Sequence, residues 1–192
     1  MADRMTREQR HGCMSRIRSS NTKPEMLLRK GLFSCGFRYR KNVKSLPGSP
    51  DIVLPKYRTV IFVNGCFWHG HAGCRYYTVP KSNTSFWEKK IRGNIERDRK
   101  DIALLEAMSW NVITVWECEL KPQSLEEIIL RVSDILARNR ESWIRNCEER
   151  RQRKIRAEND LKERKAAEKE IARLLDVPDR IVRLSRKDRD SF

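Results

Sequence analysis

Residues 60–74 read VIFVNGCFWHGHAGC, an apolar run that leads directly into a nine-residue loop from Cys66 to Cys74. The loop holds two cysteines, two histidines and two aromatic side chains. Thiolates and imidazoles are the ligands that Zn²⁺ prefers, in tetrahedral sets of four. Cys66, His71 and Cys74 can supply three of these ligands, so the fourth must come from another part of the chain.

The segments around this loop predict a small sheet. Residues 51–54 and 60–63 are short β-branched or aromatic runs joined by Pro-Lys-Tyr-Arg at 55–58, a pattern typical of a buried hairpin. Residues 111–116 predict another strand, and Cys118 lies just past its end, close to where the hairpin presents its loop. We therefore expect Cys118 to be the fourth zinc ligand. The alternative is that these thiols are reduced core cysteines.

Helical patterns alternate with these strands. A capping box with an early proline, residues 22–25, predicts a helix from about 23 to 35, and residues 37–40 alternate like a half-buried strand. A second helix is expected over about 85–108 and a third over 125–136. One side of the second helix should carry Phe86, Ile91, Ile95, Ile102, Leu105 and Met108, and the opposite side Arg92, Arg97, Arg99 and Lys100.

These elements predict an α/β sandwich in which helices flank a small mixed central sheet. We assign residues 1–139 to this domain. Residues 140–192 form a charged, mainly helical C-terminal extension, most simply a long solvated helix that ends at the latest at the Val-Pro pair of 177–178.

Composition favours a polyanionic partner. Lys and Arg number 42 against 26 Asp and Glu, a formal charge of +16 with a pI near 10.0, and the first fifty residues hold twelve basic side chains against three acidic ones. The alternative is a basic protein with solvated surface charge. Without a membrane-span or signal-peptide pattern, the chain is expected in the cytoplasm, with no membrane partner. In that reducing compartment the six cysteines are metal ligands or free thiols.

Two side chains are candidates for catalysis, each with a structural alternative. Pro50-Asp51 at a strand start is similar to the first half of the metal-binding motif of restriction-endonuclease-like nucleases, although Pro-Asp is also common in turns. The second half, an acid followed two residues later by Lys, is absent. His69 could activate water as a general base, or could replace His71 as a zinc ligand.

Phe67 and Trp68 are open to two interpretations, structural and functional, and Glu25 faces the same ambiguity. The two aromatics could be core residues, or could wedge between DNA base pairs as the apolar side chains of DNA-kinking proteins do. Glu25 already has a structural role as the third residue of the capping box.

Several segments together resemble the very short patch repair DNA mismatch endonucleases. They are residues 45–51, 60–69, 86–87, 94–101 and 115–118, and the similarity runs from about residue 7 to 139. The resemblance implies a single-domain fold of the restriction-endonuclease type that nicks one strand of duplex DNA immediately 5′ to the T of a T·G mismatch. Such mismatches arise when 5-methylcytosine deaminates.

The resemblance also implies roles for individual residues. Asp51 would bind the catalytic Mg²⁺ with help from the backbone carbonyl of Val63, His69 would be the base, Asp98 would orient His69, and Glu25 would assist at the metal through water. The structural Zn²⁺ set would be Cys66, His71, Cys74 and Cys118. The aromatic wedge beside the mismatch would consist of Phe67, Trp68 and Trp87, with Met14 intruding from the other groove.

Asn64 departs from the family pattern, which often has a histidine immediately before the Gly-Cys string. An amide can donate a hydrogen bond to DNA but cannot carry a proton. We therefore expect nicking that is slower or more dependent on the metal.

The expected partner is double-stranded DNA with a T·G mismatch, bound by a monomer, with repair proteins as further candidates. The extension lies outside the resemblance and could be a DNA-binding or partner-binding arm. Two rival functions are a restriction endonuclease of the same fold acting on matched sites and a non-catalytic zinc-braced DNA-binding protein.

Overall fold

The computed structural model describes residues 6, 8, 9, 12 and 20–175, apart from the side chains of residues 172 and 174. Packing divides the chain into two units, Met1–Trp143 and Ile144–Phe192. The strands of the described part all lie in the first unit.

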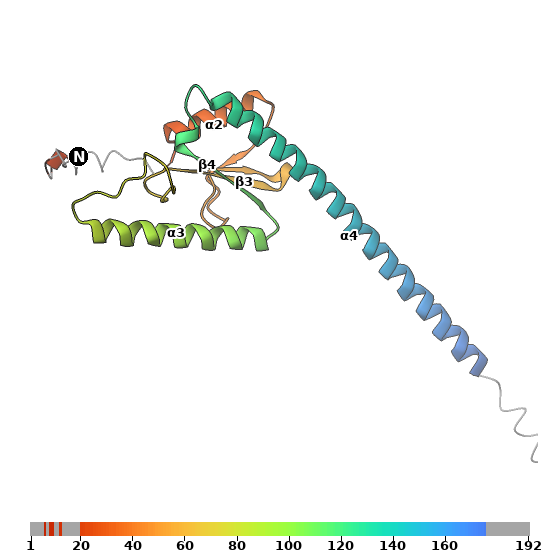
Figure 1. The fold of residues 1–192 in the computed structure, drawn as a ribbon. Helices are drawn as coiled ribbons and strands as arrows, with labels where there is room; N and C mark the ends of the chain where they lie inside the picture. Colours follow the sequence, from red (N-terminus) through yellow and green to blue (C-terminus); the bar gives the residue numbers. More distant parts are fainter. Residues whose placement is uncertain (1–5, 7, 10–11, 13–19, 176–192) are drawn as a thin grey trace, which may run out of the picture. The chain divides into compact units, whose positions relative to one another are not determined.

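The first unit is built on a four-stranded mixed sheet in the order β1-β2-β3-β4 (Figure 1). The strands are β1 (Arg40–Lys41), β2 (Ile52–Leu54), β3 (Thr59–Asn64) and β4 (Asn111–Trp116). The first three are antiparallel neighbours, whereas β3 and β4 run parallel, with Val60 opposite Val112 and Val63 opposite Val115. A parallel pair needs a crossover connection, and helix α3 (Thr84–Ala107) provides it.

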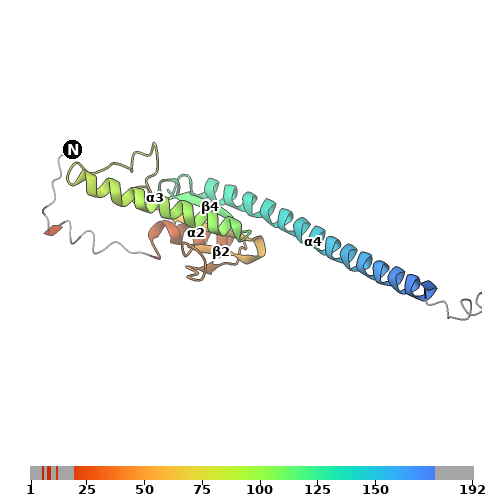
Figure 2. The same ribbon diagram turned by 90° about the horizontal axis from the view of Figure 1, so that it is seen from below.

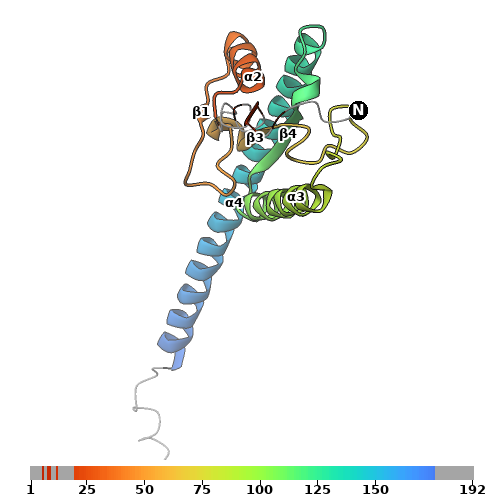
Figure 3. The same cartoon turned by 90° about the vertical axis from the view of Figure 1, so that its left-hand side faces the viewer.

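Helices cover both faces of the sheet. In Figures 1 and 3, α3 lies on one side of the strands, while α2 (Lys23–Ser34) and the first part of α4 (Leu125–Leu175) lie on the other. Seen from below, α3 runs across the sheet (Figure 2). The predicted α/β architecture with a small mixed sheet between helices is therefore confirmed.

Alternation along the strands explains this layering. Residues 52, 54, 61, 113 and 115 pack with apolar side chains of α2 and α4 in one core cluster. Their neighbours at 53 and 60, with residue 112 packed alongside, join Leu105 of α3 in a second cluster on the other face. Successive side chains of a strand point to opposite faces, so strands that are apolar throughout require cover on both sides.

Local signals set the ends of the elements around the hairpin. At the start of α2, Thr22 accepts the backbone N–H of Glu25, and the Glu25 carboxylate accepts the N–H of Thr22, which confirms the capping box. The predicted hairpin between β2 and β3 is also present, with the short 3₁₀ helix η1 (Pro55–Tyr57) as its connection.

The strand predicted at 37–40 is wrong in extent, because only Arg40–Lys41 pairs with β2. Phe37 and Tyr39 instead pack against the core cluster beneath α2, and the Phe37 ring lies 5.2 Å from that of Tyr57. Because β2 itself has only three residues, little strand is available for further pairing.

The predicted apolar side of α3 is only partly correct. Ile91 and Leu105 are buried, whereas Phe86 and Met108 near the helix ends are 57% and 45% exposed. The 24-residue helix exceeds the six-residue strands it covers, so its terminal turns lack a sheet beneath them. The helix follows Asn83, whose backbone is left-handed and whose side chain makes no capping hydrogen bond.

Helix α4 continues from the first unit into the second without a break up to Leu175. The described residues of the second unit, 144–175, form a helix whose side chains are almost all exposed. Pairs four residues apart, such as Glu149 with Arg153, place opposite charges on neighbouring turns. The expected charged helix is thus present over the described residues of the extension, up to Leu175. Among the described residues, none of the helices combines the length and apolar character that a membrane span requires.

Candidate functional site

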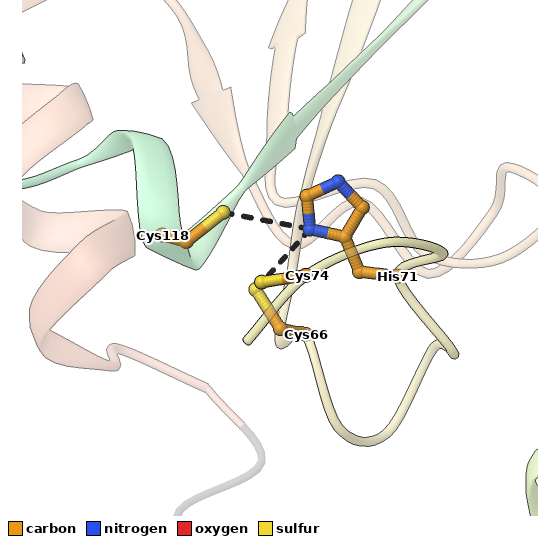
Figure 4. A group of neighbouring side chains, drawn as sticks. All are labelled: Cys66, His71, Cys74 and Cys118. Atoms are coloured by element: carbon orange, nitrogen blue, oxygen red, sulfur yellow. Dashed lines mark hydrogen bonds between the residues drawn. The ribbon is translucent and has the colours of Figure 1, made fainter. Parts of the chain in front are cut away.

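Four zinc-type donors converge where the loop after β3 meets the end of β4. Cys66, His71 and Cys74 come from the loop, and Cys118 from the short 3₁₀ helix η2 (Glu117–Glu119), as Figure 4 shows. Their ligand atoms all lie within 4.8 Å of one another. The Nδ1 atom of His71 is 3.5 Å from the Cys66 sulfur and 3.4 Å from the Cys118 sulfur. Three thiols and one imidazole in this arrangement form a candidate metal centre.

The surroundings of the cluster hold its donors in place. The His71 ring stacks on Trp116, with centroids 4.1 Å apart and planes 2° from parallel. Burial raises the pKa of the Cys66 thiol to about 12, and burial also raises the pKa of Cys118. The backbone N–H of Tyr76 stabilises the Cys74 thiolate and lowers the pKa of that thiol. In the absence of a metal, the thiols of Cys66 and Cys118 therefore remain protonated at neutral pH.

Asp51 immediately precedes the first residue of β2, at the open end of the hairpin, where β3 continues beyond the paired residues. The β2–β3 ladder pairs residues 52–54 with 59–61, so the last half of β3 lacks β2 residues as partners. The Asp51 carboxylate fills this position, because its Oδ2 accepts the backbone N–H of Val63 at 2.8 Å. The strand register thus holds the carboxylate at the end of the hairpin.

Burial dominates the electrostatics of Asp51. Desolvation raises the pKa of this carboxyl from 3.8 to about 6, against the opposing effect of the Val63 hydrogen bond. The nearby Glu25 charge raises the pKa further, while Arg29 and His69 lower it. The ionised carboxylate is destabilised in this position, so a nearby positive charge would stabilise it. A hard divalent cation, which prefers oxygen ligands, can supply that charge.

His69 and Asp98 form a close pair. The Nδ1 atom of His69 lies 2.5 Å from Oδ2 of Asp98, and each side chain is about 30% exposed. His69 comes from the loop after β3 and Asp98 from the middle of α3, so the crossover helix brings the carboxylate to the imidazole. Gly70 allows this close approach, because a Cβ at its left-handed position would lie 2.6 Å from Ile95 of α3.

Asp51 and the His69–Asp98 pair line one cleft of about 1090 Å³. The same cleft is lined by Glu25, Asn64 and Trp68. His69 is therefore separate from the zinc-type cluster, which contains His71. The alternative that His69 replaces His71 as a ligand does not agree with this geometry.

The aromatic side chains Phe67, Trp68 and Trp87 form a cluster beside the cleft. Their ring centroids are 5.1 to 6.0 Å apart in edge-to-face arrangements, and all three side chains are only partly buried. The side chain of Asn94 in α3 donates a hydrogen bond to the Trp68 carbonyl at 2.9 Å and so ties the aromatic loop to the helix. This cluster is neither fully core nor fully exposed.

Glu25 is only 4% exposed and has several partners. In addition to the capping bonds, its Oε2 atom accepts the backbone N–H of Asn21 at 3.0 Å and lies 3.1 Å from the Arg29 guanidinium. The carboxylate therefore has a structural role in α2 while it also lines the cleft.

The remaining predicted residues lie in different regions. Asn64 is the last residue of β3, Met14 lies outside the described residues, and the four basic side chains predicted on α3 are exposed. Sequence reasoning does not single out Arg29 and Asn42, which contact Asp51. The sequence pattern that could have pointed to Arg29 is its position four residues after Glu25 on the same helix. No comparable pattern points to Asn42.

Comparison with known proteins shows which protein family this chain is similar to. Residues 2–75 match the family model of the DNA mismatch endonuclease Vsr. The chain is 54% identical over 125 residues to the type II nicking enzyme V.NmeAIP of Neisseria meningitidis, which covers 65% of this chain and 89% of that protein. It is 48% identical over 131 residues to the type II nicking enzyme V.XorIIP of Xanthomonas oryzae, over 68% of this chain and 96% of that protein. The DNA mismatch endonuclease Vsr of Escherichia coli is 40% identical over 144 residues, which cover 75% of this chain and 88% of that protein.

Proposed function

Because this chain belongs to the Vsr family of DNA mismatch endonucleases, we propose that it nicks duplex DNA immediately 5′ to the T of a T·G mismatch, with Mg²⁺ as cofactor. The endonuclease activity follows from the family, which excludes the rival function of a non-catalytic DNA-binding protein. The observation that carries the proposal is the shared cleft of Asp51 and the His69–Asp98 pair.

His69 is the general base of the proposed reaction. The Asp98 carboxylate accepts a hydrogen bond from Nδ1–H, which leaves Nε2 as the ring nitrogen that can accept a proton. Nε2 takes a proton from the attacking water as the water oxygen forms a bond to phosphorus. The phosphorus–oxygen bond on the opposite side breaks, and the leaving oxygen takes a proton from solvent.

Asp51 is the proposed protein ligand of Mg²⁺, together with the backbone carbonyl of Val63, while Glu25 acts through water. When bound, Mg²⁺ would supply positive charge that stabilises the phosphate and the leaving oxygen. The fit of this site rests on the partly buried Asp51 carboxylate and its raised pKa.

Cys66, His71, Cys74 and Cys118 are the proposed ligands of a structural Zn²⁺, for which three thiols and an imidazole are a suitable donor set. Cys66 stands directly before the aromatic pair, and His69 follows that pair. Zinc bound here would brace the loop against the end of β4, so that the base keeps its position in the cleft.

Phe67, Trp68 and Trp87 form the proposed wedge at the mismatch, with Met14 on the other groove. Wedge insertion costs a few kcal/mol of unstacking, and the cost is lowest where pairing is already poor. The exposed basic side chains of α3 and the net charge of +16 supply salt-dependent affinity for the phosphate backbone. Asn64 provides a hydrogen-bond donor at the cleft but no proton transfer.

The proposed setting is the cytoplasm, where a monomer acts on chromosomal DNA and other repair proteins act on the nick. Residues 140–192 form an appendage to the endonuclease domain of 1–139 in this proposal. The remaining rival is a restriction-type endonuclease on matched sites.

The test is strand nicking of labelled duplexes that differ only in one pair, T·G or matched, in several cytosine-methylation contexts with Mg²⁺. We expect a nick 5′ to the mismatched T, which disappears in Asp51→Ala and His69→Ala. Equal nicking of the matched duplexes would favour the restriction-type function. DNA binding without Mg²⁺ should persist in both variants, and this control separates lost catalysis from lost folding.

A further inference from the structure

Arg29 of α2 is a buried guanidinium at the centre of a network around Asp51. The residue is 2% exposed. Its Nη2 donates to the backbone carbonyl of Asp51 at 2.8 Å and to Oδ1 of Asn42 at 3.0 Å, and its Nη1 donates to Oδ1 of Asn21 at 2.8 Å. The Glu25 carboxylate, 3.1 Å away, balances the charge. Within the described residues, Nε of Arg29 is the buried side-chain nitrogen or oxygen atom without a hydrogen-bond partner.

Asn42 connects this guanidinium to the carboxylate of Asp51. While its Oδ1 accepts from Arg29, its Nδ2 faces Oδ1 of Asp51 at 3.4 Å and its backbone N–H donates to the Asp51 carbonyl, also at 3.4 Å. The backbone of Asn42 is left-handed, with φ of 45°. Asn adopts this conformation more readily than most residues, so both the backbone and the amide fit the position.

Together with Val63, these two residues leave little freedom to Asp51. Val63 holds Oδ2, Asn42 lies beside Oδ1, and Arg29 holds the main-chain carbonyl. The contacts come from β3, the segment after β1, and α2, so three parts of the fold position one carboxyl group. Hydrogen bonds of this kind set the orientation of a metal-ligating carboxylate before the metal arrives.

We propose that Arg29 and Asn42 are positioning residues that orient the Asp51 carboxylate for its divalent cation. The inference deepens the proposed function and rests on Asp51 being the metal ligand. Neither residue has to touch the DNA or the reacting atoms. Arg29 orders Asn42 and the Asp51 backbone, and Asn42 orders the carboxylate itself.

The test uses Asn42→Gly and Arg29→Lys in the full-length, zinc-loaded protein. Glycine tolerates the left-handed backbone, so Asn42→Gly removes the amide without adding strain and leaves the Arg29–Glu25 pair intact. Lys at 29 keeps the charge but lacks the planar set of donors. The matched control is Ser109→Gly. Ser109 also has a left-handed backbone, with φ of 62°, and it lies two residues after the last residue of α3, outside the residues that line the cleft.

The first readout is Mn²⁺ binding to the protein without DNA, monitored by electron paramagnetic resonance. Mn²⁺ can replace Mg²⁺ in this measurement because it accepts the same hard oxygen ligands. We expect Asn42→Gly and Arg29→Lys to bind Mn²⁺ about 10- to 100-fold more weakly, as loss of a hydrogen bond behind a metal ligand does. The Mg²⁺ concentration for half-maximal nicking should rise in proportion, and saturating Mg²⁺ should restore the rate of Asn42→Gly. Ser109→Gly should match the natural protein.

If the Mn²⁺ affinity and the Mg²⁺ dependence of nicking are unchanged in Asn42→Gly, the inference is overturned, even if the melting temperature of the variant falls. Asp51→Ala separates this result from failure of the proposed function. If Asp51→Ala loses Mn²⁺ binding while Asn42→Gly keeps it, the positioning role alone is wrong. If Asp51→Ala binds Mn²⁺ normally, the proposed metal ligand is wrong and the positioning role falls with it.

Discussion

His69 and Asp98 are 29 positions apart in the sequence, yet Nδ1 of His69 lies 2.5 Å from Oδ2 of Asp98. The pairing favours the tautomer in which Nδ1 carries the proton, so that Nε2 would keep its lone pair for the attacking water of the proposed reaction. The contact depends on the crossover from β3 through α3, which places the middle of the helix beside the loop that follows β3.

Asp98→Asn should therefore lower the nicking rate while leaving DNA affinity unchanged. The Asn amide can donate to Nδ1, and this favours the tautomer that carries its proton on Nε2 and so cannot act as a base. General-base catalysis contributes about 10²- to 10⁴-fold, and we expect a loss in that range. Single-turnover nicking with saturating enzyme measures the rate, and filter binding measures affinity. Asp134→Asn, a substitution on α4 outside the residues lining the cleft, is the control. A rate within about twofold of the natural protein would contradict the orienting role of Asp98.

The raised pKa of Asp51 predicts a pH-dependent cost to stability. Between the unfolded pKa of 3.8 and the folded value of about 6, the folded state holds more protons than the unfolded state, so this carboxyl destabilises the fold increasingly as the pH rises. The cost is complete above about pH 6 and absent below about pH 4. Asp51→Asn should be more stable than the natural protein at pH 7.5 without divalent cations, by at most about 3 kcal/mol. The difference should vanish at pH 4.

Urea unfolding of the two proteins at pH 4 and pH 7.5 measures this difference, and effects of pH that are common to both proteins cancel. The Asn side chain still accepts the Val63 N–H, so the variant removes the charge and keeps this hydrogen bond, while its amide nitrogen replaces the oxygen that faces Asn42 Nδ2 at 3.4 Å. Greater stability of the natural protein at pH 7.5 would show that the Arg29 and His69 charges outweigh desolvation.

The sequence predicts those parts of this fold that depend on neighbours in the chain. The capping box of Thr22 and Glu25, the hairpin between β2 and β3, and β4 follow from local patterns, and each is present. Phe86 shows the limit of such patterns. It has the helical spacing of a core residue but is exposed, because periodicity does not reveal where the sheet beneath a helix ends.

The candidate site shows the same division. The convergence of Cys118 with Cys66, His71 and Cys74 could be predicted because strand ends place loops together. The contact of Asp98 with His69 is expected only from the family resemblance. Arg29 and Asn42 lie 22 and 9 positions from Asp51, and only the assembled fold brings them to it.

Removal of the zinc-type cluster should loosen the loop that carries the aromatic side chains and His69. We expect Cys118→Ser to contain less than one zinc per chain and to lose stability, since a ligand at about 1,000 times its Kd stabilises a fold by about 4.1 kcal/mol. Cys147→Ser is the matched control, because Cys147 is exposed and is not part of the cluster. Zinc content by mass spectrometry and thermal melting provide the measurements. Full zinc occupancy in Cys118→Ser would remove this thiol from the ligand set.

The pKa shifts in the cluster add a pH dependence to zinc binding. Because burial raises the pKa of Cys66 to about 12, zinc must displace a proton from this thiol at neutral pH. Zinc affinity should therefore fall as the pH is lowered from 8 to 6, and binding should release protons. Calorimetric titration in two buffers with different ionisation enthalpies measures this release. Binding without proton release would contradict the protonated state of the metal-free cluster.

Asn64→His should raise the nicking rate. Asn64 ends β3 and lines the cleft beside Asp51 and His69, so an imidazole there could both donate a hydrogen bond to the phosphate and transfer a proton. We expect a gain of about tenfold at limiting Mg²⁺, which is below the usual range for a well-placed general acid. The gain should be largest below about pH 6.5, where imidazole is protonated. Asn64→Gln keeps the amide and should show no gain. His69 is present in all three proteins, so its contribution is common to them. A ratio of one between the rates of Asn64→His and the natural protein would mean that the amide does not limit the reaction.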